Sequence, residues 1–211
     1  MLNYLYSIRD RHVADIMNGD KTFELRTKIP REMKEAIDKG EKVIMWIYCT
    51  KGGKRFVKWN GIYMVNDKYV LTTDKLLNGL VVAKCVVDSY EEVSNRFNGN
   101  EWVYDDWLLN VTCLDENQLD DYLKQDGNYR FGYAIHLTQV EMLDKPLQVG
   151  EFYSYKVIHK PSTLTEPITD DMPFDKKLEL LKQCESYTVE RTPLTRAPQS
   201  YQKVKAPEGK E

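Results

Sequence analysis

The start of the chain carries the pattern that most restricts its fold. Residues 2–8 are rich in aromatics and alternate in character, which is typical of a half-buried strand. Val13 and Ile16 then lie on one helical face, and Gly19 follows as a residue that readily adopts the left-handed conformation that ends helices. The pattern predicts a strand followed directly by a short helix over residues 10–18.

A second strand is predicted over residues 21–26, where apolar and polar side chains alternate. Its apolar side chains point to one face, whereas Thr22, Glu24 and Arg26 point to the other. With Lys21 these groups form a compact cluster of cations and an anion. Such a cluster can bind a phosphate, polarise a carbonyl, or only form internal ion pairs on a solvated edge.

Composition restricts where a nucleic-acid site can lie. The chain has 211 residues, 42% of them hydrophobic, which suits one substantial core and one domain rather than two. Its 30 Lys and Arg residues are balanced by 33 Asp and Glu residues, giving a net charge of −3. The whole chain therefore does not attract polyanions, and any nucleic-acid site must be a local basic patch.

The sequence also predicts a compartment. No basic leader precedes the first strand, and no apolar stretch approaches the length of a membrane span. Cys49, Cys85, Cys113 and Cys184 are widely separated and lack the spacing of a zinc site. We expect a cytoplasmic protein with reduced cysteines, no membrane partner, no metal site and no cofactor.

The rest of the chain is mostly strand and turn. Strands are predicted at residues 42–50, 80–88 and 133–140, which are rich in β-branched and aromatic residues. An inserted hairpin or meander is predicted within residues 51–78, where turn residues separate short apolar runs. The other predictions are a weak helix at 32–39, a helix at 115–124, a loop at 142–147, irregular structure at 160–173, a helix at 174–184 and a polar tail at 206–211. The pattern of residues 90–113 is irregular and aromatic, and we expect Trp102 and Trp107 to pack on the cover of the sheet.

Several short motifs follow one another along the chain. They are GDKTFELR at 19–26, VIMWIYCT at 43–50, LNGLVVA at 77–83, GYAIH at 132–136 and DKPL at 144–147. In this order they resemble the ASCH domain family, and RAPQSY at 196–201 resembles a C-terminal signature of its phage-type members. The resemblance implies an α+β fold, namely a PUA-like mixed β-barrel with short helices packed on it and an inserted hairpin.

The motifs also suggest a division of the chain. The resemblance to the family covers most of residues 1–150. We therefore predict an ASCH/PUA-like barrel domain over residues 1–158. A C-terminal extension over residues 159–211 would hold one helix, a returning segment and the polar tail.

The resemblance implies a cleft at the barrel's mouth and a role in RNA-related processes. Some family members are amidohydrolases that deacylate N4-acetylcytidine with a lysine, a threonine and a glutamate. Lys21 matches that lysine, whereas Glu24 stands where those enzymes have the threonine nucleophile. A different hydrolytic interpretation is cleavage of an RNA phosphodiester, with Glu24 as base and Lys21 or Arg26 as the cation.

Further residues are candidates for ligand contacts. His136 assists such a reaction if its strand faces the cleft, and is otherwise a sheet histidine with its hydrogen bonds satisfied. Lys54 and Trp59 lie in a run where basic and aromatic residues interleave. In one interpretation, bases stack on the aromatic residues of this run while its cations hold phosphates. In the other, the run is an ordinary solvated hairpin. Tyr201, near Arg196, either adds a second lip to the cleft or fastens the tail to the barrel.

The sequence favours an ASCH-like module that binds RNA or a nucleotide-like small molecule in a charged cleft. Its candidate ligand-binding residues are Arg9, Lys21, Thr22, Glu24, Arg26, Lys54, Trp59, His136 and Tyr201. Lys21 and Glu24 are the candidate catalytic residues, although the sequence leaves open whether the protein is an enzyme. The alternatives are the small hydrolase described above and a phage protein-interaction or counter-defence module that engages a host protein.

Overall fold

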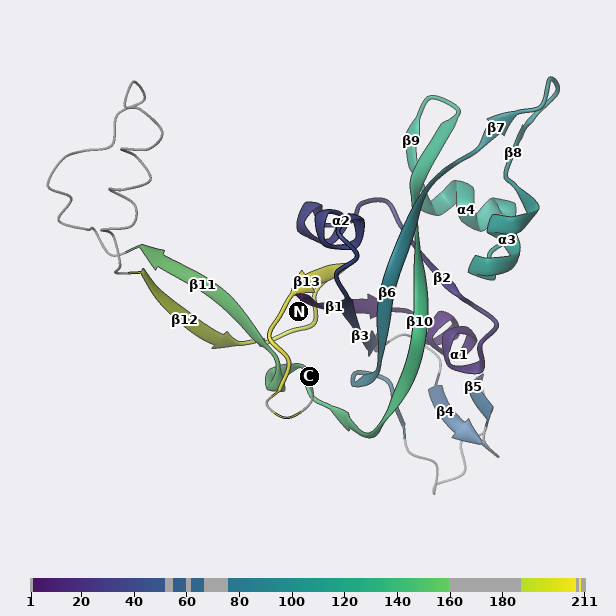
Figure 1. Cartoon of the computed structure of the whole chain (residues 1–211). Coiled ribbons are helices and arrows are strands. Elements are labelled where there is room, and N and C mark those ends of the chain that lie inside the picture. Colours follow the sequence, from purple (N-terminus) through teal and green to yellow (C-terminus); the bar gives the residue numbers. More distant parts are fainter. Residues whose placement is uncertain are drawn as a thin grey trace, which may run out of the picture.

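One large sheet forms the body of the protein, and short helices pack on it (Figure 1). The computed structural model describes residues 2–51, 55–59, 62–66, 76–159, 187–207 and 209. The strands of the sheet, in spatial order, are β13 (Tyr201–Lys203), β1 (Leu2–Ile8), β3 (Val43–Cys49), β6 (Val81–Ser94), β10 (Tyr129–Leu147) and β2 (Phe23–Arg26), and β9 (Lys124–Asp126) pairs with β10.

The sheet is mixed, because β1 and β3 are parallel while its other pairs are antiparallel. The two parallel strands pair over their full length, starting with Leu2 opposite Val43. Parallel neighbours need a crossover connection. Here α1 (Asp10–Asn18), β2 and α2 (Arg31–Asp38) provide it. The crossover carries β2 to the far end of the sheet, where it pairs with β10.

The predicted helices within the described residues are confirmed. In α1, Val13, Ala14 and Ile16 are buried, and Gly19 ends the helix with a φ of 84°. Residues 32–39 correspond to α2, and residues 115–124 correspond to α4 (Glu116–Tyr122). The side chain of Asp115 caps α4.

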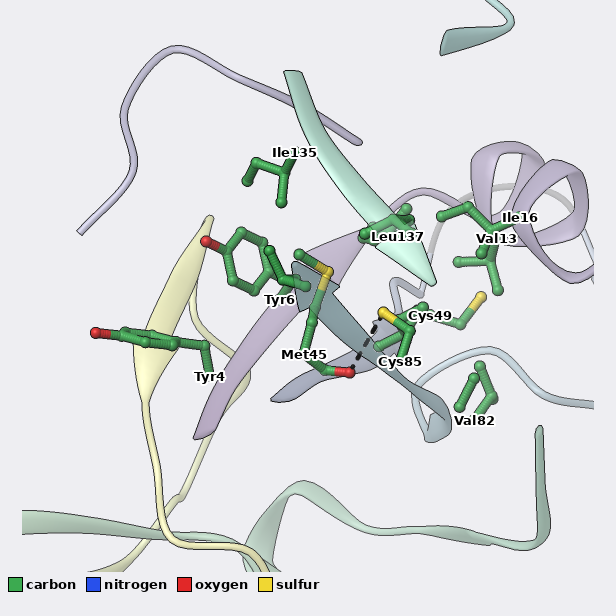
Figure 2. Packing of buried hydrophobic residues seen from close by; sticks show 14 of the residues in the cluster. Tyr4, Tyr6, Val13, Ile16, Met45, Cys49, Val82, Cys85, Ile135 and Leu137 are labelled. Atoms are coloured by element: carbon green, nitrogen blue, oxygen red, sulfur yellow. Dashed lines mark hydrogen bonds between the residues drawn. The ribbon is translucent and has the colours of Figure 1, made fainter. Parts of the chain in front are cut away.

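The core is divided into three clusters. Figure 2 shows part of the first, in which the thiol of Cys85 donates to the carbonyl oxygen of Met45 at 3.7 Å. The second surrounds Trp46, whose indole N–H donates to Asn3 Oδ1 at 2.9 Å. The third packs α3 (Asp106–Thr112) and α4 against β2 and β10 through residues such as Leu108. This third cluster fixes α4 beside the end of β2.

In the described parts of the chain, three two-stranded sheets stand outside the large one. The predicted inserted hairpin is present as β4 (Arg55–Trp59) and β5 (Ile62–Asn66), and Asn18 of α1 holds it by exchanging hydrogen bonds with the backbone of Tyr63. In a second pair, β7 (Arg96–Phe97) lies beside β8 (Trp102–Val103). In a third, β11 (Tyr153–His159) lies beside β12 (Tyr187–Pro193). The pair of β11 and β12 extends away from the body in Figure 1.

The predicted loop at residues 142–147 is wrong, and the irregular pattern of residues 90–113 hides several short elements. Residues 142–147 belong to β10 rather than to a loop, because two register shifts between Thr138 and Leu147 let the strand continue past Pro146. These shifts break the alternation that identifies a strand. Residues 90–113 contain the end of β6, β7, β8 and α3.

The α+β fold class with a mixed sheet, short helices and an inserted hairpin is confirmed. The short η1 (Val149–Glu151) completes the helical elements of the described ranges. The predictions for residues 160–173 and 174–184 and for Cys184 lie outside the described residues. The division at residue 158 stays a prediction. In the described ranges, every helix is too short or too polar to cross a bilayer.

Candidate functional site

The sheet curves so that its last strand, β2, returns to the end of β1. Arg26 makes the connection, because its Nη2 donates to the carbonyl oxygen of Ser7 at 2.9 Å. On its other side β2 pairs with β10, with Arg26 opposite Tyr133. A side-chain hydrogen bond thus closes the gap between β2 and β1, and the charged side chains of β2 lie at this junction.

Lys21, Glu24 and Arg26 form one buried ion cluster. Arg26 Nη2 lies 2.9 Å from Glu24 Oε1, and Lys21 Nζ lies 3.5 Å from Glu24 Oε2. The three residues are only 2%, 6% and 6% exposed, in sequence order. Lys21 Nζ also donates to the carbonyl oxygen of Thr112 at 2.8 Å. Both carboxylate oxygens therefore face a cation, and the cluster keeps one excess positive charge.

The guanidinium of Arg26 is held from further directions. Its Nη1 lies 3.4 Å from the hydroxyl of Tyr122, and its Cζ lies 5.2 Å from the centroid of the Tyr6 ring. Burial by itself lowers the pKa of Arg26, but the nearby Glu24, Tyr122 and Tyr6 outweigh burial and raise it. The guanidinium therefore stays charged.

A cavity of about 740 Å³ opens beside this cluster. Five parts of the described chain line it: the end of β1 with the start of α1, the strand β2 with its flanking residues, Thr50 after β3, the helix α4 with the preceding Leu114, and residues 199–200. Ser7 fixes the last of these, since its N–H donates to the carbonyl oxygen of Ser200 at 2.9 Å and its hydroxyl donates to that of Pro198 at 2.5 Å. We call residues 198–200 the C-terminal strap.

Comparison with known proteins gives a partial likeness in fold. No protein-family model matches the chain, and no curated protein matches it. A crystal structure of ASCH from Zymomonas mobilis has a TM-score of 0.47 at 14% identity, covering 96% of this chain and 87% of that one. A structure of one mutant of that protein has a TM-score of 0.46 at 14% identity, covering 96% of this chain and 88% of the mutant chain. A structure of another mutant has a TM-score of 0.40 at 16% identity, covering 70% of this chain and 76% of the mutant chain. At such identity, similarity concerns the fold and assigns no activity.

The cavity has an exposed cation at its rim and a histidine in its wall. Arg9 precedes α1, is exposed, and makes no ion pair with the residues that the structure describes. His12 lies one turn further along, with Nδ1 buried and 3.7 Å from Asp15 Oδ2. Burial and the charge of Lys21 lower the pKa of His12, so its imidazole is neutral near pH 7.

Several lining residues were missed by the sequence prediction. His12 stands three residues after Arg9, at the spacing of one helical face, and that spacing was a usable signal. Gln118 and Tyr122 come from α4, and Gln199 comes from the strap. No sequence signal connects those three with β2, because only the curvature of the sheet and the third core cluster bring them together.

The predicted residues of β2 and α1 have different outcomes. Arg9, Lys21, Glu24 and Arg26 all line the cavity. Thr22 does not, because the strand begins only at Phe23 and the alternation does not extend back to it. The exposed Thr22 instead uses its backbone N–H to bind the carbonyl oxygen of Val111 at 3.1 Å.

The other predicted ligand contacts lie away from the cavity. His136 has its Nδ1 2.7 Å from Asp88 Oδ1 and its ring against Phe23, so it is a sheet histidine with a partner. Tyr201 stacks on Tyr6 at 5.4 Å and fastens the tail to β1.

The predicted aromatic and basic run includes β4 of the hairpin. Trp59 lies in β4 opposite Ile62, and Lys54 lies outside the described residues. Phe56, the other aromatic residue of that run, is fully buried and packs against Tyr63, so it cannot stack on a base.

The described residues contain no group of three or more His, Cys, Asp and Glu side chains placed to hold a metal ion. The cavity itself offers an ion cluster, a neutral histidine and a polar rim. Three cationic side chains, Arg9, Lys21 and Arg26, face two carboxylates, Glu24 and Asp121. Such a lining attracts an anionic group.

Proposed function

We propose that this cavity binds a nucleotide-like ligand, either free or as part of a single-stranded RNA, and holds it by its phosphate. The observation that carries the proposal is the convergence of Lys21, Glu24 and Arg26 on one cavity with Arg9 at its rim. The chain carries a net charge of −3, yet cations outnumber carboxylates among these lining residues. A local positive potential in an acidic chain favours a specific anion site over general binding of polyanions.

The cations of the cavity differ in their contacts, and this difference supports the proposal. Lys21 and Arg26 are committed to Glu24 and to backbone carbonyl oxygens, so they supply fixed positive potential rather than free hydrogen-bond donors. Arg9 is exposed and lacks an ion pair among the described residues. Its planar guanidinium suits two-point contact with a phosphate. Arg9 is therefore the residue that we propose for direct phosphate contact.

The size and lining of the cavity also suit a nucleotide. Ligand sites typically occupy 300–1,000 Å³, and the cavity holds about 740 Å³. Its wall contains hydroxyl, carboxamide and aromatic side chains beside the ions. A simple inorganic anion would leave most of that wall without a contact.

Hydrolysis of a nucleotide or an acylated nucleoside is the second candidate, and His12 is the observation that favours it. A neutral imidazole in the wall can accept a proton. Against it, both oxygens of Glu24 face cations, which leaves neither free to attack. Incubation with acylated cytidines and with single-stranded RNA tests turnover, and Lys21→Ala should abolish any product.

Binding is tested by calorimetric titration with nucleoside 5′-monophosphates and short single-stranded RNA. Arg9→Ala should weaken binding about tenfold, equal to about 1.4 kcal/mol, because a charged hydrogen-bonding group is lost. Arg31→Ala is the matched control, since Arg31 is 91% exposed and paired with Glu35 outside the cavity. Equal weakening by the two variants at one salt concentration would show general charge attraction and contradict the proposal.

A further inference from the structure

The cavity wall formed by α4 and the C-terminal strap has a different character from the cationic wall. It presents one aromatic ring, Tyr122, and two carboxamides, Gln118 and Gln199. We infer that this wall is a nucleobase subsite, in which Tyr122 stacks on the base while Gln118 and Gln199 bind its polar edge. The inference rests on the proposed function and adds the part of the ligand that determines specificity.

Tyr122 is placed to act as a stacking surface. It is the last residue of α4 and is 42% exposed, although its hydroxyl is held 3.4 Å from Arg26 Nη1. The side chain is therefore anchored at its polar end and still partly exposed. Aromatic side chains with a free face are the usual platforms for unpaired bases, and stacking tolerates every base.

Gln118 offers hydrogen-bond donors in a fixed orientation. Its Oε1 accepts the backbone N–H of Asp115 at 3.1 Å, and its own N–H donates to Asp115 Oδ1 at 2.9 Å. Because a backbone N–H can only donate, the atom facing it must be the carboxamide oxygen. The Nε2 group is left for the cavity, so Gln118 is suited to a carbonyl oxygen or a ring nitrogen of a base.

Gln199 complements Gln118 from the C-terminal strap. Hydrogen bonds from Ser7 hold the carbonyl oxygens of its two neighbours, Pro198 and Ser200, and so fix the backbone of the strap. The exposed side chain of Gln199 has no hydrogen bond to the residues that the structure describes. It can both donate and accept. A base edge that combines a donor and an acceptor fits such a pair of carboxamides.

The charge of this wall argues for a base rather than a second phosphate. The cations of the cavity come from β2 and from the residues at the start of α1, whereas α4 contributes Asp121 to the lining. A second anionic group on this side would face that carboxylate. A neutral, flat and polar group such as a nucleobase avoids the repulsion and uses the exposed ring.

The test compares ligands with and without a base. The dissociation constants of the four ribonucleoside 5′-monophosphates and of ribose 5-phosphate are measured by calorimetry on the full chain. We expect at least one nucleotide to bind about fivefold or more tightly than ribose 5-phosphate, because one stacked base contributes about this factor or more. Tyr122→Ala should remove the preference, and Tyr122→Phe, which keeps the ring, should retain it.

Substitutions of Gln199 and Gln118 test recognition of the base without disturbing the cap of α4. Gln199→Ala should weaken nucleotide binding about fivefold and leave ribose 5-phosphate binding unchanged. Gln118→Glu keeps a side chain that can accept the N–H of Asp115, so α4 stays capped while the donor is lost. Its readout is the ratio of nucleotide to ribose 5-phosphate affinity, because the added charge affects both ligands. We expect that ratio to fall.

Failure of the base subsite and failure of the proposed function give different results. If ribose 5-phosphate binds as tightly as every nucleotide and Tyr122→Ala changes neither, the base subsite is wrong while phosphate capture stands. If none of the five probes binds, both the subsite and the proposed function are wrong. Binding of every probe that persists unchanged in Arg9→Ala would contradict the proposed function separately.

Discussion

Glu24 is the residue on which the charge balance of the cavity depends. Its two oxygens face Arg26 at 2.9 Å and Lys21 at 3.5 Å, and all three side chains are almost completely buried. Glu24→Gln would leave two buried cations without a carboxylate. We expect a loss of about 3–5 kcal/mol of unfolding free energy, measured by urea denaturation followed by tryptophan fluorescence.

An exposed ion pair in the same protein provides the control for Glu24. Glu35 pairs with Arg31 on α2, and their side chains are 48% and 91% exposed. Glu35→Gln should change the unfolding free energy by less than about 1 kcal/mol. If the two glutamine variants lose the same small amount, the cluster at Glu24 is not a coupled, buried unit.

His12 makes stability depend on pH, and the sign follows from its lowered pKa. Burial, followed by the charge of Lys21, puts the folded-state pKa below the ordinary value of 6.5. The unfolded chain therefore binds the proton more readily. The neutral imidazole of His12 therefore contributes its full stabilisation above about pH 6.5. This contribution is lost as the pH falls toward the folded-state pKa.

A substitution of His12 tests that dependence. His12→Gln should reduce the decline in unfolding free energy between pH 7 and pH 5, relative to the unaltered protein. His136→Gln, which removes a histidine outside the cavity wall, should leave the contribution of His12 in place. An unchanged pH profile in His12→Gln would show that the burial of this imidazole has no energetic consequence.

At the scale of elements, the contact between β2 and β10 requires a residue without a side chain. A Cβ atom at Gly132 would lie 2.8 Å from the carbonyl oxygen of Arg26 and 2.5 Å from Leu123 Cδ2. Gly132→Ala should therefore displace β2 or α4 and cost about 1–3 kcal/mol. Ligand affinity should fall with stability, because Arg26 and Tyr122 belong to the displaced elements.

Gly150 supplies the comparison for that substitution. A Cβ atom there would have its nearest neighbour, the carbonyl oxygen of Leu194, at an ordinary 3.7 Å. Gly150→Ala should change thermal stability by less than about 0.5 kcal/mol, as expected away from close contacts. If Gly132→Ala is equally well tolerated, the packing of β2 on β10 is looser than the structure indicates.

Elements with strong local signals could be predicted from sequence, and elements that depend on distant packing could not. The strand and helix before Gly19 were predicted because alternation, helical spacing and a glycine stop agree there. The far end of β10 was missed because its register shifts interrupt the alternation. The helix α3 was missed, whereas α4, which is equally short, was predicted with Asp115 as its capping residue; Asp105 at the start of α3 makes no such capping hydrogen bond.

At the scale of the whole molecule, the site is made from both ends of the chain. The sequence predicted the cluster of Lys21, Glu24 and Arg26, since one strand and a residue two positions before it supply all three groups. It did not place Tyr122 or Gln199 beside them. Those two positions follow from the curvature of the sheet and from the strap bound to Ser7, which are consequences of long-range pairing.

Mapping the place where a nucleotide binds shows directly whether the cavity beside Lys21, Glu24 and Arg26 is its site. A nucleoside 5′-monophosphate is titrated into ¹⁵N-labelled protein, and the shifts of the backbone amide signals are mapped onto the structure. We predict that the shifts concentrate at the start of α1, in β2, at the end of α4 and at residues 199–200. Shifts confined to other elements, such as β4 and β5, or no shifts at saturating nucleotide, would contradict it.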